Sequence, residues 1–236
     1  MSLRPRARPA WRGARPPEDG AAVALTYSSS PDKAREVVES IEKAGGKALA
    51  VQADAADVEA VRNAVARTVQ ELGGLDILVN NAGVGVFSPI EELPIEEFDR
   101  MLNINVRGLF VASQEASRHL KEGGRIIHIG SVNADRIPFP GGSVYALTKG
   151  AVASFTRGLA RDLGPRGITV NNVQPGPVDT DMNPAQGAFA EQILTYQALG
   201  RYGKDTEVAS FVSYLAGPES SYITGANLTI DGGFGA

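Results

Sequence analysis

Short β-rich runs alternate with helical segments along most of this chain, and this alternation is the feature that most constrains its fold. Strands that alternate with helices build βαβ units, in which right-handed crossovers join parallel strands. We therefore expect one doubly wound α/β domain at residues 18–236, with a mostly parallel sheet and helices on both faces. Strands are expected at 22–27, 47–52, 75–80, 125–130, 168–174 and 226–230, and helices at 31–44, 57–72, 95–120, 145–163 and 204–215.

Composition narrows the classes of function. The chain has 236 residues and no cysteine, which excludes disulfides, thiolate chemistry and cysteine-ligated metal, and we expect no metal site. A formal net charge of −4 gives no reason to expect nucleic acid or an anionic membrane as partner. No apolar run approaches the ~18 residues of a membrane span. We expect a cytoplasmic protein that acts on a small molecule.

Small and polar residues follow directly after three of the expected strands. The segment NNAG (80–83) follows LDILV, Ser131 follows RIIHIG, and PGPVDT (175–180) follows TVNNVQ. Doubly wound sheets bind ligands at the carboxyl ends of their strands. We therefore predict one ligand site at this edge of the sheet.

Tyr145 and Lys149 are one turn apart on an expected helix, so they share a face. A free phenol has a pKa of about 10, and a nearby cation would draw it toward neutrality, where it can transfer protons. By itself, such a tyrosine–lysine pair is also typical of a solvated helix surface and does not indicate catalysis. The prediction therefore depends on Ser131, fourteen residues earlier, and on Asn105 in the preceding helix.

Taken together, these motifs resemble the short-chain dehydrogenase/reductase family. The resemblance rests on the NNAG turn, the helix asparagine, the serine, Tyr-x-x-x-Lys, Pro-Gly-x-x-x-Thr and the closing segment Asp231-Gly232-Gly233, and it extends from about Gly20 to the C-terminus. Within the family, the chain is most similar to 3-oxoacyl-[acyl-carrier-protein] reductase-type members. The family has a Rossmann-like fold and moves hydride between a nicotinamide cofactor and a carbonyl carbon.

The resemblance implies a role for each motif residue. Tyr145 would protonate the carbonyl oxygen, and Ser131 would hydrogen-bond that oxygen and orient it. Lys149 would lower the pKa of Tyr145 and hold the nicotinamide ribose, and Asn105 would position a water for proton relay. The implied activity is reduction of a ketone or 3-oxoacyl carbonyl. Oxidation of a polyol, sugar or other secondary alcohol is one alternative, and a catalytically impaired binding or structural protein is another.

Cofactor contacts are implied in the same way. They are expected at Ser28, Asp54, Ala55, Asn80, Ala82, Gly83, Tyr145, Lys149, Pro175, Gly176, Val178 and Thr180. The strand at 22–27 leads into Ser28-Ser29-Ser30 and lacks the acid that would bind the ribose diol of NAD. Hydroxyls together with Lys33 suit a 2′-phosphate, so NADP(H) is favoured over NAD(H).

The N-terminal stretch departs from the family. Residues 1–17 are rich in Arg and Pro, and the family's first strand and its Thr-Gly-x-x-x-Gly-x-Gly turn are missing. Because that strand is normally central, its loss is expected to split the sheet and expose unpaired edges. We interpret residues 1–17 as a disordered or artefactual leader, and residues 4–17 as an out-of-frame or mis-started translation. Sequencing the gene upstream of Gly20 would test this.

Three further expectations concern surfaces and the core. The helices at 95–120 and 145–163 are implied as the contact surfaces of a homotetramer or dimer, and residues 181–203 as a lid over the substrate. Phe87, Phe139 and Met182 are interpreted either as a pocket wall or as ordinary core and rim. His128 is interpreted as a satisfied core histidine.

Overall fold

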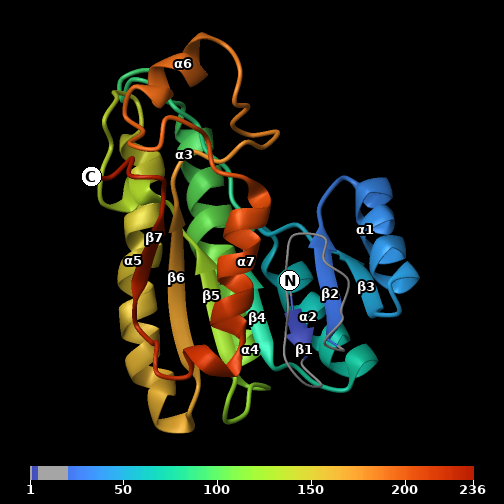
Figure 1. The fold of residues 1–236 in the computed structure, drawn as a ribbon. Helices are drawn as coiled ribbons and strands as arrows, with labels where there is room; N and C mark the ends of the chain where they lie inside the picture. Colours follow the sequence, from blue (N-terminus) through green and yellow to red (C-terminus); the bar gives the residue numbers. More distant parts are fainter. Residues whose placement is uncertain (1, 5–20) are drawn as a thin grey trace.

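The computed structural model describes residues 2–4 and 21–236. Its sheet has the strand order β3-β2-β1-β4-β5-β6-β7, and every pairing is parallel except the two made by β1. The expected doubly wound, mostly parallel sheet is therefore confirmed (Figure 1). The strands are β1 (Ser2–Arg4), β2 (Ala22–Tyr27), β3 (Lys47–Gln52), β4 (Ile77–Asn80), β5 (Arg125–Ile129), β6 (Thr169–Pro175) and β7 (Asn227–Ile230).

Helices cover both faces of this sheet, as the crossover pattern requires. They are α1 (Pro31–Lys43), α2 (Val58–Leu72), α3 (Ile95–Leu102), α4 (Leu109–Ser117), α5 (Ser143–Leu163), α6 (Ala188–Leu194) and α7 (Asp205–Ala216). Three short 3₁₀ turns, η2 (Val132–Ala134), η3 (Gly164–Arg166) and η4 (Pro218–Ser220), and one π-helical turn, η1 (Asn103–Gly108), complete the described helical elements. Among the described residues, no helix combines the length and apolar character that a membrane span requires.

Two apolar clusters lie on opposite faces of the sheet. Leu78 and Ile126 pack with residues of α2, α4 and α5, whereas Ile77 and Ile127 pack with residues of α7. Successive side chains of a strand point to opposite faces, so neighbouring apolar residues enter different layers. This accounts for the continuous apolar runs in the sequence, because strands buried on both faces do not alternate with polar residues.

The expected split of the sheet is wrong. Strand β1 lies between β2 and β4 and pairs antiparallel with both, with Leu3 opposite Val23 on one side and Ile77 on the other. A backbone of three residues is enough to occupy the gap, because unpaired N–H and C=O groups on two facing strand edges strongly favour pairing. The remainder of the atypical leader, residues 1 and 5–17, lies outside the described residues.

The expected helix at 95–120 is interrupted. Between α3 and α4 the chain forms a π-helical turn, η1 (Asn103–Gly108). Such turns occur mostly as single-turn bulges inside α-helices, and they are frequent at functional sites. Here the turn contains Asn105, which is buried.

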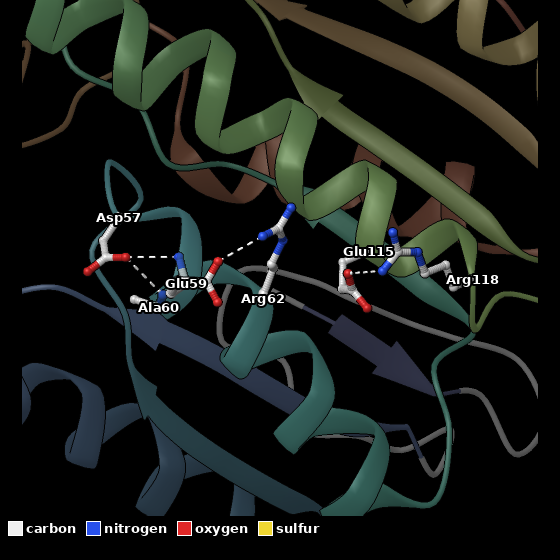
Figure 2. A network of polar contacts seen from close by, with 6 residues as sticks. All are labelled: Asp57, Glu59, Ala60, Arg62, Glu115 and Arg118. Atoms are coloured by element: carbon white, nitrogen blue, oxygen red, sulfur yellow. Dashed lines mark hydrogen bonds and ion pairs between the residues drawn. The ribbon is translucent and has the colours of Figure 1, made fainter.

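Polar contacts fix the start of α2 and the end of α4. Asp57 caps α2, where its carboxylate accepts hydrogen bonds from the backbone N–H of Glu59 (2.9 Å) and of Ala60 (3.0 Å), as Figure 2 shows. Figure 2 also shows the ion pair of Glu115 with Arg118, at 2.8 Å. The cap at Asp57 holds the loop between β3 and α2, which contains two of the predicted cofactor residues.

Candidate active site

Ser131 and Tyr145 meet at the carboxyl end of β5. Ser131 follows this strand by two residues, and Tyr145 lies in the first turn of α5. The Ser131 hydroxyl donates to Asn133 Oδ1 and accepts from Asn133 N–H, both at 3.1 Å, and it also hydrogen-bonds the Tyr145 side chain. The predicted pairing of these two side chains at one sheet edge is thus present. Asn133, which orients the serine, carries no sequence signal because its contact depends on the 3₁₀ turn after β5.

Burial raises the pKa of Tyr145, and the hydrogen bond with Ser131 lowers it by less. The expectation of a lowered tyrosine pKa is therefore not met in this structure. A phenolate loses more solvation than a phenol when it is buried, and here that cost exceeds the benefit of the hydrogen bond. Tyr145 is consequently held as a phenol at neutral pH, which is the proton-donating form.

Lys149 is buried beside the tyrosine, with 6% of its surface exposed. Its Nζ lies 5.6 Å from the centroid of the Tyr145 ring and donates to the Ile129 carbonyl at 3.0 Å. Burial lowers the pKa of Lys149 to about 8, because desolvation penalises the charged form. An ammonium has three N–H donors, and among the described residues the structure gives this one a single acceptor. The remaining donors suit the hydroxyls of a ribose.

Asn105 connects this group to the loop after β4. Its side-chain oxygen accepts from the N–H of Val84, and its amide nitrogen donates to the carbonyl of Val84, both at 2.8 Å. The same nitrogen donates to the hydroxyl of Thr148 at 3.1 Å, and that hydroxyl donates to the Tyr145 carbonyl at 2.7 Å. Asn105 therefore ties the loop to the helix of Tyr145. Thr148 was not predicted, although it lies inside the segment YALTK.

Gly83 lies against this group. A Cβ added there would meet Asn105 Oδ1 at 3.5 Å and Lys149 Nζ at 3.6 Å. The backbone of the NNAG turn therefore approaches both side chains closely, as a glycine allows. The residues that the sequence singled out as catalytic, namely Asn105, Ser131, Tyr145 and Lys149, are all brought together at this place.

Asn80 is directed elsewhere. Its amide nitrogen donates to the Ser113 hydroxyl at 3.0 Å and contacts His128 Nδ1 at 3.1 Å, in the layer between the sheet and α4. The side chain of Asn80, the first residue of the NNAG turn, therefore packs into the core and does not face the site. The backbone of Asn80 is not engaged by these side-chain contacts and stays the predicted contact with the cofactor. Ala82, two residues on, is exposed.

His128 is fully buried and stacks on Phe155, with ring centroids 5.9 Å apart. Because Asn80 can only donate through its amide nitrogen, Nδ1 accepts and the ring proton is assigned to Nε2. The interpretation of His128 as a core residue agrees with its burial. The ring is not fully hydrogen-bonded, however, because Nε2 has no hydrogen-bond partner among the described residues. Burial lowers the pKa of His128 to about 3.

A stability test follows from that pKa. The unfolded chain binds a proton at His128 below pH 6.5, whereas the folded chain does so only near pH 3. Protonation of the unfolded chain therefore destabilises the folded state: the full free energy of unfolding is present above pH 6.5 and decreases as the pH falls toward 3. We expect the free energy of unfolding to decrease by about 2 kcal/mol more between pH 7.5 and pH 5 in the wild type than in His128→Gln. Urea titrations at the two pH values measure this. An equal decrease in both proteins would contradict the buried, neutral histidine.

The cofactor residues predicted at the adenine end lie in two adjacent loops. Ser28 follows β2, and its carbonyl accepts from the Gln52 side chain at 3.1 Å. Asp54 follows β3, and its carboxylate accepts from the N–H of Ala56 at 2.9 Å, which makes it a turn residue as well as an exposed acid. Ala55 packs against Gly108 of η1, so that this loop and the helix bearing Asn105 are in contact.

The predicted nicotinamide end lies after β6. Gly176 is packed so closely on Asp231 that an added Cβ would lie 2.6 Å from the Asp231 Cβ, and only glycine fits there. Asp231 in turn accepts from the N–H of Gly233 (2.9 Å) and of Gly235 (2.7 Å). Pro175 ends β6, Val178 forms a β-bridge with Gly203, and Thr180 is exposed. The segment after β6 is therefore fixed by the C-terminal motif.

Lys33, which we expected near a 2′-phosphate, makes an ion pair with Asp181 at 3.0 Å. Both side chains are mostly exposed, and exposed pairs contribute little to stability. The lysine is therefore not committed to this partner. The contact also shows that the start of α1 and the segment after β6 approach each other.

The residues that would hold the nicotinamide half of the cofactor fit that group, since the buried ammonium of Lys149 has donors to spare beside the close backbone of Gly83. The pyrophosphate half is different. The family's glycine turn would fall within residues 5–20, which lie outside the described residues.

Aromatic rings line one side of the site. The rings of Phe87 and Tyr145 have centroids 5.3 Å apart, and those of Phe87 and Phe139 are 5.8 Å apart. Phe189 on α6 contacts Phe139 at 5.9 Å and was not singled out by the sequence. Of the two interpretations left open for the phenylalanines, these contacts favour the wall over ordinary core.

Comparison with known proteins agrees with this geometry. A family model described as Enoyl-(Acyl carrier protein) reductase matches residues 14–235. A short-chain dehydrogenase/reductase from Serratia marcescens has a TM-score of 0.90 at 60% identity, covering 91% of this chain and 88% of that one. A short-chain dehydrogenase from Burkholderia cenocepacia, solved in complex with NADP, has a TM-score of 0.90 at 53% identity, with 91% and 88% covered. This chain belongs to the short-chain dehydrogenase/reductase family, whose members are NAD(P)(H)-dependent oxidoreductases.

Two curated relatives have different names. The cyclic-di-GMP-binding biofilm dispersal mediator protein of Escherichia coli is 50% identical over 218 residues, which are 92% of this chain and 88% of that protein. The 3-oxoacyl-[acyl-carrier-protein] reductase of Staphylococcus aureus is 37% identical, with 92% and 89% covered. The resemblance to reductases of this type is confirmed.

Proposed function

We propose that this protein is an NADP(H)-dependent reductase that converts a ketone or 3-oxoacyl-type carbonyl to a secondary alcohol. The observation that carries the proposal is the convergence of Ser131, Tyr145 and the buried ammonium of Lys149, whose Nζ lies 5.6 Å from the centroid of the tyrosine ring. These three side chains lie at the carboxyl end of β5, the edge at which doubly wound sheets bind ligands.

Each of these side chains has a defined task in the proposed reaction. Tyr145, kept protonated by burial, donates its hydroxyl proton to the carbonyl oxygen, and Ser131 hydrogen-bonds the same oxygen and orients it. Lys149 holds the nicotinamide ribose with its free N–H donors and presents a positive charge to the tyrosine oxygen as its proton leaves. The nicotinamide, when bound, supplies the hydride to the carbonyl carbon.

Asn105 is proposed as the start of a proton relay. Its oxygen and nitrogen are held by Val84 and Thr148, so its position is fixed, and it lies beside Gly83 and Lys149. A water bound here would return a proton to Tyr145 through Lys149.

The preference for NADP(H) rests on two observations. The end of β2 carries the exposed Ser28 rather than an acid, and Lys33 lies at the first turn of α1. A carboxylate there would repel a 2′-phosphate, whereas hydroxyls and an ammonium attract it. The Burkholderia structure with NADP supports the same choice.

A second candidate is a catalytically impaired binding protein. The observation that favours it is the lack of the family's glycine-rich turn anywhere in the N-terminal stretch. The Escherichia coli relative is named for cyclic-di-GMP binding, and that dinucleotide is the ligand we propose for this candidate. Oxidation of a polyol, sugar or other secondary alcohol is the same chemistry in reverse and uses the same residues.

We propose further that the protein is cytoplasmic and forms a homotetramer or dimer through α4 and α5. Phe110 on α4 and Leu147 on α5 are half-exposed, and Gly150 and Gly158 leave open space on α5 for a neighbouring helix.

The test is a titration of the purified protein with NADPH, NADH and cyclic-di-GMP, followed by assays with a panel of ketones and alcohols. We expect NADPH to bind more tightly than NADH, and ketones to be reduced. If neither nicotinamide cofactor binds at near-millimolar concentration while cyclic-di-GMP does, the binding protein is the correct candidate. The N-terminal sequence of the protein used must be verified, because the presence of the glycine-rich turn would favour the reductase and its absence the binding protein.

A further inference from the structure

Four aromatic rings lie in a row that begins at Tyr145. Phe87 is tilted by 50° to the Tyr145 ring at 5.3 Å, Phe139 is edge-on to Phe87 at 5.8 Å, and Phe189 is edge-on to Phe139 at 5.9 Å. The three phenylalanines come from three separate segments: the loop after β4, the loop before α5, and α6. Their convergence is therefore a product of the tertiary structure.

These phenylalanine rings are open to solvent on one side. Phe87 is 49% exposed and Phe189 is 52% exposed, whereas Phe139 between them is partly buried. Contiguous exposed apolar surface is costly in a soluble protein and marks a ligand or partner site. Since this surface begins at the proposed proton donor, the ligand is the substrate.

Glycines hold the first part of the wall in place. A Cβ on Gly85 would meet the Tyr145 ring at 3.3 Å, and a Cβ on Gly142 would meet Ile137 at 3.0 Å and the two neighbouring phenylalanine rings at 3.7 Å. The N–H of Ser88 donates to the carbonyl of Gly141 at 3.0 Å, which ties the loop of Phe87 to the loop before α5. Phe87 and Phe139 are thereby preorganised rather than loosely placed.

The far end of the wall is fixed by α6, which lies at the end of the molecule where β6 leads into the 176–204 segment (Figure 1). Ala190 and Ile193 of α6 are buried in a cluster with Val132 and Phe234, and Phe139 packs against that cluster. Phe189, which immediately precedes Ala190 on the same helix, remains exposed.

We propose that the substrate is a ketone that carries a flat aromatic ring system, bound against the wall formed by Phe87, Phe139 and Phe189 with its carbonyl at Tyr145. The proposal rests on the reductase function above and adds the substrate class. Because these rings are packed edge to face, they present both π faces and ring edges to a ligand. An aromatic ligand can stack on the faces and contact the edges, whereas an alkyl chain contributes only buried apolar area. Because the row continues beyond the ring next to Tyr145, a fused bicyclic system uses more of it than a single ring does.

The experiment compares two ketones in the holoenzyme with NADPH: 2-acetylnaphthalene, and 2-octanone as an apolar ketone without a ring. The test variant is Phe87→Leu/Phe189→Leu, which keeps apolar side chains and removes two rings. Tyr222→Leu is the control, because the side chain of Tyr222 is fully exposed and far along the chain from the wall. We expect the double variant to lose about tenfold or more in kcat/KM for 2-acetylnaphthalene and less than about threefold for 2-octanone. The control should change neither value.

An equal loss for both ketones, or a wild-type preference for 2-octanone, would overturn the proposal while leaving the reductase function intact. If the wild type reduces neither ketone, the binding of 2-acetylnaphthalene to the NADPH-loaded protein is measured by calorimetry. If the wild type binds 2-acetylnaphthalene and the double variant does not, the aromatic wall is supported even though the protein does not reduce these ketones. No binding by the wild type would overturn the wall as well. Thermal unfolding of each variant verifies that it is folded.

Discussion

Tyr145→Phe is expected to lower kcat for ketone reduction by about a thousandfold, while NADPH binding weakens by no more than about tenfold, the value of one hydrogen bond. The substitution removes one oxygen and leaves a ring of the same shape, so the contact with Phe87 at 5.3 Å is retained. What is lost is the hydroxyl that hydrogen-bonds Ser131 and, in the proposed reaction, gives its proton to the carbonyl oxygen.

The control for this substitution is Tyr222→Phe, which removes a phenol oxygen from a fully exposed ring. It should leave both kcat and NADPH binding unchanged. Stopped-flow assays with saturating NADPH separate the chemical step from cofactor release. Full turnover by Tyr145→Phe would show that another group supplies the proton.

Gly108→Ala is expected to destabilise the protein by about 2–3 kcal/mol and to lower its Tm by about 5–10 °C. An added methyl group at Gly108 would overlap the backbone carbonyl oxygen of Ala55, a rigid group that cannot rotate away. Alanine is favoured over glycine in a helix by about 1 kcal/mol, which offsets only part of this strain. Because Ala55 is a predicted cofactor contact, NADPH binding should weaken as well.

Gly164→Ala is the matched control for this position. Gly164 has helical φ of −54°, and an added Cβ would meet nothing within 4 Å. Its Tm should remain at or slightly above that of the wild type, and its NADPH affinity should not change. Differential scanning calorimetry measures both variants. If Gly108→Ala melts at the wild-type temperature, the close packing of η1 on the loop after β3 is incorrect.

Most of the fold was predictable because its signals are local. Strands such as Lys47–Gln52 and helices such as α2 follow from apolar runs, helical spacing and terminal glycines, and the structure places them within two residues of the expected ends. The π-helical turn at Asn103–Gly108 was not predictable. Its sequence, NINVRG, carries no local signal that separates a π-helical turn from an α-helix, and the close packing of Gly108 on Ala55 is a tertiary contact.

The N-terminal strand shows a different limit. Ser2–Arg4 is too short for periodicity to predict a strand, and it forms because β2 and β4 present two unpaired edges to it. A split sheet is expected when the family strand is missing, but here another segment of the chain takes the place of that strand. The interpretation of residues 4–17 as a translation error stays a prediction.

For the candidate site, the sequence predicted the residues better than it predicted their electrostatics. Spacing and strand ends were enough to group Ser131, Tyr145 and Lys149. The direction of the tyrosine pKa shift depends on burial, which spacing does not give, and here burial outweighs the opposing effect of Ser131. Phe189 was missed for a similar reason, since only the fold of the 176–204 segment brings α6 to Phe139.

The most direct test of the central claim is a double-variant cycle on Ser131 and Tyr145, with kcat for ketone reduction as the readout. If the two hydroxyls act on one carbonyl oxygen, Ser131→Ala alone should cost about a hundredfold, yet should cost less than about threefold in a Tyr145→Phe background. Losses that multiply independently, or a Ser131→Ala enzyme with wild-type kcat, would contradict a shared catalytic unit at the end of β5.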